Sequence, residues 1–319
     1  MTCHAWLATP HGAGGVAIIE LAGEVEVILE KIAAPGPWPV GKVRLRELAS
    51  VDTGLVVRIT NDRAQLTPHG GPHLVGLLRE ALCDAGAVWL EEVPDDAYPE
   101  AKSSIEGAML ATVAQAQSPA AVKLLLDQPA RWKRDDSPLS PEDVARSTRL
   151  NRLIDPPKVA LLGAPNAGKS TLLNCLVGDE TAIVSPEPGT TRDYLGVRLL
   201  LGGLAVDWID TPGVRISSDE IEQQAIQHAS SLINEATLVI RIFAPDAPPP
   251  PQTDAPEVLC IVNKADLEGA AALAAQHNAL LVSALHRTGI SDLTQAISQR
   301  LVPESDLAHP GRWKFPGCG

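Results

Sequence analysis

The stretch at residues 163–171, GAPNAGKST, has the composition and spacing of a loop that binds phosphate. Its glycines let backbone N–H groups turn inward, and the N-terminus of a following helix adds partial positive charge. Lys169 would bring a full charge to the β- and γ-phosphate oxygens, and the hydroxyl of Ser170 would face Mg²⁺. The preceding KVALLG is typical of a strand and the following STLLNCLVG of a helix, as a P-loop requires. We expect these residues to bind the nucleotide, with Lys169 also taking part in catalysis: Gly163, Asn166, Ala167, Gly168, Lys169, Ser170 and Thr171.

The spacing alone leaves open a glycine-rich turn without a nucleotide, and three later motifs argue against it. DTPG at residues 210–213 would place a carboxylate behind Mg²⁺ and a glycine N–H at the γ-phosphate. In NKAD at residues 263–266, Asp266 can accept from guanine N1–H and the 2-amino group together, whereas adenine has an acceptor at N1. SA at residues 283–284 suits a backbone contact to the guanine oxygen. Four motifs in this order at strand ends predict a GTPase. The further nucleotide-binding residues are Asp210, Gly213, Asn263, Lys264, Asp266, Ser283 and Ala284.

The usual means of hydrolysing GTP are absent from these motifs. Ras-type GTPases follow this aspartate motif with a glutamine that orients water, but the residue after DTPG here is Val214. No arginine finger is identifiable, although Arg192 in GTTRD is near enough in sequence to be a candidate. Another group must therefore offset the developing charge and position the water.

The composition narrows the class of protein. A chain of 319 residues with 45% apolar residues suggests two or three domains. A net charge of −13 argues against broad binding to nucleic-acid backbones. The five scattered cysteines are typical of reduced thiols rather than of a disulfide framework or a zinc site. No basic and apolar leader opens the sequence and no apolar run approaches about 18 residues, so we expect a cytoplasmic protein without a membrane segment.

Hydrophobic patterning predicts an α/β fold in four parts. Residues 1–97 form a small α/β domain, with strands at VAIIEL and GLVVRIT and a Leu-rich helix. Residues 98–157 hold a helical pair and a Pro-punctuated connector. Residues 158–302 alternate strand and helix, which predicts a parallel, Ras-like G-domain sheet, and residues 303–319 form a tail. We interpret the Pro-rich run at residues 244–256 as a stiff surface loop, with recognition by an SH3-like partner as the alternative.

The chain resembles the tRNA-modification GTPase family MnmE, also called TrmE, in the following motifs. AWLATPHGAGGVAIIELAG at residues 5–23 and HGGP at residues 69–72 are similar to the two N-terminal signatures of that family. PNAGKSTLLN, SPEPGTTRD and DTPGVRISSDEIE are similar to its G-domain motifs. Bacterial GTPases such as Era and Der share the G-domain motifs, so the N-terminal pair makes the resemblance specific. We identify the chain as a shortened and divergent member.

The resemblance implies how charge and water are supplied. In this family a P-loop asparagine binds K⁺, which takes the place of an arginine finger, and Asn166 matches it. Oxygen atoms of the switch loop complete the K⁺ site, and the matching residues are Ser185, Glu187 and Thr190. Thr191 would join Ser170 on Mg²⁺, and Glu222 matches the family's water-orienting glutamate.

The resemblance also implies a process and partners. These are modification of wobble uridine in tRNA, a homodimer formed through the N-terminal domain, and an FAD-dependent partner of the MnmG type through which tRNA is reached. A tetrahydrofolate derivative would bind the N-terminal domain. A GTP-switched assembly or regulatory protein without the modification chemistry is the alternative. For Cys318 the choice lies between a displaced functional thiol and an exposed cysteine in the tail.

Overall fold

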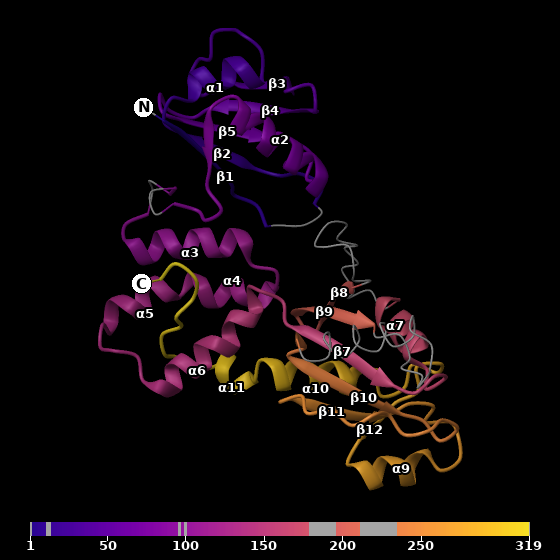
Figure 1. Cartoon of the computed structure of the whole chain (residues 1–319). Helices are drawn as coiled ribbons and strands as arrows, with labels where there is room; N and C mark the ends of the chain where they lie inside the picture. Colours follow the sequence, from indigo (N-terminus) through magenta and orange to yellow (C-terminus); the bar gives the residue numbers. More distant parts are fainter. Residues whose placement is uncertain are drawn as a thin grey trace.

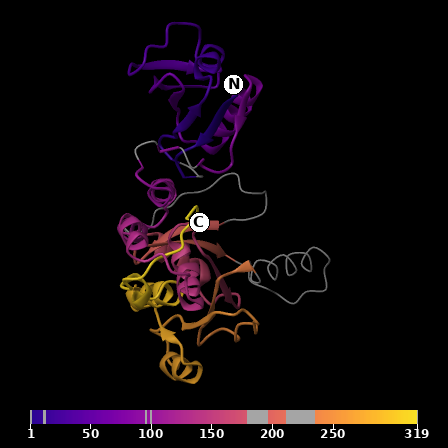
Figure 2. The ribbon, with the colours of Figure 1, turned by 90° about the vertical axis from the view of Figure 1, so that its left-hand side faces the viewer.

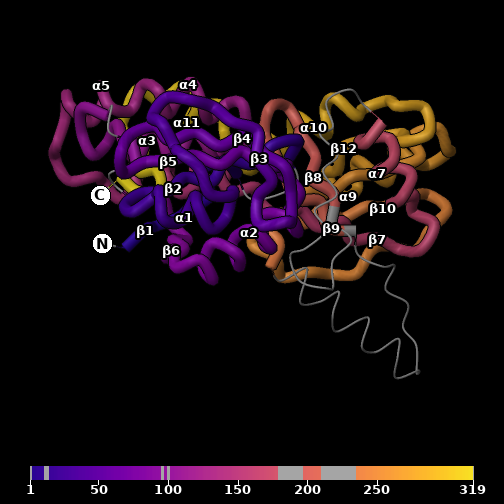
Figure 3. Tube along the Cα trace, turned by 90° about the horizontal axis from the view of Figure 1, so that it is seen from above, coloured from indigo at the N-terminus to yellow at the C-terminus, as the bar shows by residue number. Residues whose placement is uncertain are grey.

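The computed structural model describes residues 2–10, 14–94, 97–98, 101–178, 196–210 and 235–318. The chain forms an N-terminal α/β part, a group of helices and a second α/β part (Figure 1). Turned by 90°, the N-terminal part stands at one end of the molecule and α9 (Ala270–His277) at the other (Figure 2). Viewed from above, the N-terminal part overlies the helices, and the second sheet extends to one side (Figure 3). The α/β prediction is confirmed.

The N-terminal sheet is mostly antiparallel, and only β1 and β6 pair in parallel among its described strands. Its order is β3-β4-β5-β2-β1-β6. The strands are β1 (Cys3–Leu7), β2 (Ile19–Ala22), β3 (Val43–Leu48), β4 (Asp52–Arg58), β5 (Arg63–Thr67) and β6 (Ala87–Trp89). The helices α1 (Val25–Ile32) and α2 (Pro72–Asp84) contribute buried leucines to the core beneath the sheet. The two predicted strands are present, although β2 begins three residues later than VAIIEL suggested.

The middle of the chain is more helical than predicted. The expected pair is α3 (Ser104–Gln115) and α4 (Pro119–Leu126). The side chain of Ser103 caps α3 by accepting from the N–H of Glu106 at 3.2 Å. Two further helices follow, α5 (Gln128–Arg134) and α6 (Pro141–Leu150), and the second lies in the segment that we expected to be a connector. A capping box of Ser140 and Asp143 starts α6, so the signal for this helix was present in the sequence.

The predicted tail is part of the helical core rather than a free end. After α11 (Glu304–Leu307) the chain runs among α3 to α6 (Figure 1). The backbone N–H of Trp313 donates to Gln128 Oε1 at 2.8 Å, and its indole N–H donates to Asn151 Oδ1 at 2.8 Å. Trp313 and Phe315 are almost completely buried, at 1% and 2% exposure. Apolar packing with satisfied polar groups therefore fixes this segment.

The second sheet has the strand order β12-β11-β10-β7-β9-β8, and among its described strands only β8 and β9 pair antiparallel. Its strands are β7 (Lys158–Gly163), β8 (Gly196–Leu201), β9 (Leu204–Asp210), β10 (Leu238–Phe243), β11 (Val258–Val262) and β12 (Leu280–Leu281). The described helices of this part are α7 (Lys169–Val177), α9 and α10 (Ile290–Leu301). β7 and β10 are buried on both faces, as expected for central parallel strands. None of the helices in the described ranges is long and apolar enough to cross a membrane.

Candidate nucleotide-binding site

The predicted motifs meet at one edge of the second sheet. The P-loop follows β7, NKAD follows β11, and SA follows β12. The parallel register of β7 with β9 sets Leu161 opposite Asp210, and that of β7 with β10 sets Gly163 opposite Ile242. Because the carboxyl ends of parallel strands lie together, this edge is where such sheets bind ligands. The prediction that the motifs stand at strand ends is confirmed.

The P-loop is closely packed and curls around its own lysine. The ammonium of Lys169 donates to the carbonyl oxygens of Gly163 at 2.9 Å and Ala164 at 3.0 Å. Gly168 has a φ of +92°, and a Cβ there would lie 2.2 Å from Asn263 Nδ2, so only glycine fits. Asn166 also has a left-handed backbone, with φ +66°. Left-handed conformations such as those of Asn166 and Gly168 let a loop turn its N–H groups inward ahead of a helix, as phosphate binding requires.

Asn263 joins the loops that would read the base to the loop that would hold the phosphates. Its side chain is buried, with 2% of the residue exposed. The amide Nδ2 donates to the carbonyl of Ala167 at 3.0 Å, and Oδ1 accepts from the backbone N–H of Ala284 at 3.0 Å. Asn263 therefore acts as a bridge between three motifs, a role that its place in NKAD does not reveal.

The carboxylate of Asp266 is oriented by the next motif. Its Oδ1 accepts from the hydroxyl of Ser283 at 2.7 Å, and this hydrogen bond holds the pKa of the carboxyl below its usual value. Ser283 Oγ in turn accepts from the backbone N–H of His286 at 3.3 Å. The imidazole Nε2 of His286 lies 4.0 Å from Asp266 Oδ2. An ionised, fixed carboxylate is the acceptor needed for two parallel N–H donors of guanine.

Two residues that contact the NKAD motif were missed by the sequence analysis. One is His286; the other is Asp246, whose carboxylate pairs with the ammonium of Lys264 at 2.6 Å. Neither lies in a recognised motif, and Asp246 belongs to the Pro-rich loop after β10. Contacts between loops on separate strands leave no local pattern in a sequence.

Several predicted site residues lie outside the residues that the structure describes. The main chain of Asp210 ends β9, and its side chain is outside the described part. Of the residues in the described range, Ser170 and Thr171 are exposed in the first turn of α7. The predicted residues outside the described ranges are Ser185, Glu187, Thr190, Thr191, Arg192, Gly213 and Glu222.

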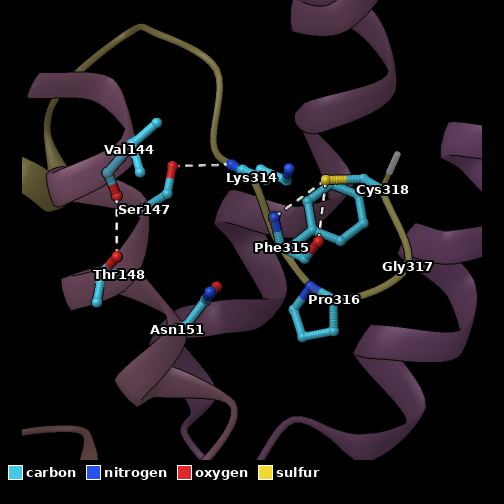
Figure 4. A pocket seen from close by; sticks show the side chains of 9 residues that line it. All are labelled: Val144, Ser147, Thr148, Asn151, Lys314, Phe315, Pro316, Gly317 and Cys318. Atoms are coloured by element: carbon cyan, nitrogen blue, oxygen red, sulfur yellow. Dashed lines mark hydrogen bonds between the residues drawn. The ribbon is translucent and has the colours of Figure 1, made fainter. Parts of the chain in front are cut away.

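A pocket of about 550 Å³ lies beside the C-terminal segment, away from the nucleotide-site motifs. It is formed by one face of α6 and by residues 314–318 (Figure 4). The Cys318 sulfur lies 2.9 Å from the carbonyl oxygen of Phe315, to which it can donate, and 3.1 Å from that residue's N–H. Burial raises the pKa of the Cys318 thiol to about 11. The expectation of an exposed tail cysteine is wrong, because the residue is only 3% exposed.

The model of the 50S ribosome-binding GTPase family matches residues 158–273. A tRNA modification GTPase MnmE of Acidiphilium cryptum is 46% identical over 156 residues, which span 47% of this chain but only 34% of that protein. A tRNA modification GTPase MnmE of Halorhodospira halophila is 30% identical over 338 residues, covering 82% of this chain and 70% of that protein. A crystal structure of Aquifex aeolicus Era bound to GDP.AlF4- has a TM-score of 0.33 and 23% identity, covering 51% of this chain and 60% of Era.

Proposed function

We propose that this chain, a GTPase that belongs to the MnmE family, uses GTP hydrolysis to support modification of the wobble uridine in tRNA. The observation that carries this proposal is the connected set of P-loop, Asn263 and Asp266 contacts, in a chain that matches an MnmE protein over 82% of its length. GTP and Mg²⁺ are the ligands that this class of domain binds.

In this proposal each motif has one task. Lys169 neutralises the β- and γ-phosphates, Ser170 with Thr191 holds Mg²⁺, and Asp266 reads guanine. Glu222 orients the attacking water. Asp210 and Gly213 complete the phosphate side, and Ser283 and Ala284 complete the base side.

The charge that an arginine finger supplies elsewhere comes, we propose, from K⁺. Asn166 supports this because it is exposed at the tip of the P-loop. Within the described part of the chain, its side-chain amide has no hydrogen-bond partner, so its oxygen is available to a cation. Ser185, Glu187 and Thr190 would supply the other ligands. A fixed cation between the phosphates stabilises negative charge that develops during hydrolysis.

A homodimer through the N-terminal domain is part of the same proposal. The outer face of the edge strand β3 and its neighbour β4 is apolar, because Leu45 lies opposite Leu55 and Val43 opposite Val57. Val43, Leu45 and Leu55 are 60%, 63% and 44% exposed. An exposed apolar face on an edge strand favours pairing with another surface, and a second copy carries the identical one.

A tetrahydrofolate derivative would bind, in this proposal, where the two N-terminal signatures meet. The N–H of Gly14 donates to the carbonyl of Gly70 at 3.0 Å, and Val16 bridges to His69. Asp52 Oδ1 lies 2.8 Å from His69 Nδ1 and so orients the exposed imidazole. Titration calorimetry with 5-formyltetrahydrofolate tests this site, and a His69→Ala variant should bind more weakly. Equal binding heats for the wild type and His69→Ala would contradict a folate site at His69.

The partners follow from the family rather than from the described surfaces. We propose an FAD-dependent partner of the MnmG type, with tRNA bound by the complex, because the net charge of −13 disfavours broad contact with RNA. We propose a cytoplasmic location on the same ground, because a protein that acts on tRNA must reach it there.

Profiling of wobble uridines in tRNA from cells that lack the protein tests the proposal. Loss of the modification, restored by the wild type but not by Asp266→Asn, would support it. The amide of this variant should favour xanthosine triphosphate over GTP, because it can donate to a 2-oxo group. Unchanged wobble uridines together with normal GTP hydrolysis would instead favour the assembly or regulatory GTPase.

A further inference from the structure

The lysine of the NKAD motif is held by a residue that no motif includes. Lys264 stands between Asn263 and Asp266, with a left-handed φ of +60°. Its ammonium lies 2.6 Å from Asp246 Oδ2 and 2.9 Å from Oδ1. No other hydrogen-bond partner of this ammonium is found among the described residues. Both carboxylate oxygens therefore fix the end of a side chain that starts within the base-reading loop.

The backbone on both sides of this pair is itself fixed. The N–H of Ala265 donates to the carbonyl of Val282 at 3.0 Å, which ties the NKAD loop to the strand end before SA. On the other side, the N–H of Ala247 donates to the carbonyl of Ala244 at 3.2 Å and closes a turn around Asp246. The two ends of the ion pair are thus carried by anchored loops.

The Pro-rich loop gains a role from this arrangement. The guanidinium of Arg241 on β10 donates to the carbonyl oxygens of Pro250 at 3.1 Å and Pro251 at 3.2 Å. The same guanidinium lies over the ring of Phe243, 5.2 Å from its centroid. These contacts tie the loop at its middle, and because prolines restrict φ, they limit the conformations open to the short segment that carries Asp246.

We propose that Asp246 is a positioning residue of the guanine site, which holds the Lys264 side chain beside the base-reading carboxylate and is itself braced by the Pro-rich loop. This inference rests on the proposed GTP site. Lys264 also acts on Asp266, because its positive charge favours the ionised carboxylate. Asp246 remains ionised at neutral pH, since the hydrogen bond from Lys264 lowers the pKa of its carboxyl.

The arrangement predicts a specific kinetic signature. Asp246→Asn should raise Kd for GDP and GTP by the same factor of about 2 to 5, as expected for losing a half-exposed ion pair. The turnover number at saturating GTP should stay unchanged, because the γ-phosphate is not touched. Asp254→Asn in the same loop is the matched control, since Asp254 is exposed and makes no ion pair among the described residues.

The experiment is a double-mutant cycle on the full chain, with Kd measured by a fluorescent GDP analogue and thermal unfolding recorded for each variant. In a Lys264→Ala background, Asp246→Asn should have no further effect, whereas Asp246→Glu alone should retain most of the affinity. Arg241→Gln should weaken binding in the same direction as Asp246→Asn. An unchanged Kd in Arg241→Gln would show that the Pro-rich loop does not support Asp246.

Three results would overturn the positioning role of Asp246. The first is a Kd of Asp246→Asn equal to that of Asp254→Asn. The second is a Kd of Asp246→Asn tighter than that of the wild type. The third is an effect of Asp246→Asn on Kd that is as large in the Lys264→Ala background as in the wild type. A tighter Kd would mean that Asp246 withholds Lys264 from the nucleotide. A wild type that binds no guanine nucleotide would defeat the proposed function itself, and so the two failures are distinguishable.

Discussion

The side-chain amide of Asn263 donates to the carbonyl oxygen of Ala167 at 3.0 Å, across 96 residues of sequence. This hydrogen bond joins the loop that would read guanine to the loop that would hold phosphate. Because the same side chain also accepts from Ala284, one residue sets the spacing between the two ends of the nucleotide site.

We expect Asn263→Ala to weaken nucleotide binding and to destabilise the fold. The change leaves buried backbone groups of Ala167 and Ala284 without their partners, which costs about 1–3 kcal/mol. Chemical denaturation and the Kd for a fluorescent GDP analogue measure both effects. Gln295→Ala, at an exposed position of α10, is the control, and equal values for the two variants would contradict the bridging role.

Guanine binding should persist to a lower pH than an ordinary aspartate allows. The hydrogen bond from Ser283 lowers the pKa of Asp266, so the carboxylate that accepts from guanine is present above that lowered pKa and is lost only below it. Ser283→Ala should therefore move the acidic loss of affinity to higher pH. The measurement is Kd for GDP between about pH 4 and 7, with circular dichroism as the control for folding. Coincident pH profiles would show that Ser283 does not tune Asp266.

Turnover of GTP should be fast in K⁺ and slow in Na⁺ at equal ionic strength, if K⁺ supplies the missing catalytic charge. Loss of such a charge costs on the order of 10²–10³ in rate. Asn166→Ala should remove the response to K⁺. Glu222→Ala should lower turnover while K⁺ still binds, so the response to K⁺ should remain. Phosphate release is measured at several protein concentrations. Equal rates in both salts throughout would shift the source of charge to Arg192 or to a partner.

Leu45→Glu should convert a homodimer into a monomer. Leu45 is 63% exposed on the apolar face of β3 and β4, and burying a carboxylate in that face would oppose association. Light scattering over a range of concentrations gives the mass. His73→Glu, an exposed change at the start of α2, is the control. A wild type that is monomeric at every concentration would rule out this dimer.

Cys318 should react with thiol reagents only after unfolding, whereas exposed Cys83 should react at once. A pKa of about 11 leaves roughly one thiolate in a thousand at pH 8, and burial blocks access as well. Counting thiols with an aromatic disulfide before and after adding denaturant tests this, and Cys83→Ser should abolish the fast phase. Rapid labelling of Cys318 in the folded protein would instead support the hypothesis that Cys318 is a functional thiol.

Much of the nucleotide site could be predicted from the sequence because each of its motifs is local. The P-loop needs glycines, a lysine and a hydroxyl within nine residues, between a strand and a helix, and the structure has them at residues 163–171. The cap of α3 is local in the same way, since Ser103 and Glu106 are three residues apart. The capping box of α6 is equally local, although the prolines and charges around it led us to expect a connector there.

Only the tertiary structure decided which loops touch. Lys264 and Asp246 are 18 residues apart, and they pair because β10 and β11 are neighbours whose carboxyl ends lie together. The final segment enters the helical core because Trp313 and Phe315 bury apolar area there, and Gln128 and Asn151 satisfy its polar groups. The sequence by itself determined the chemistry of each motif through short-range spacing, whereas strand order and packing determined the contacts between distant residues.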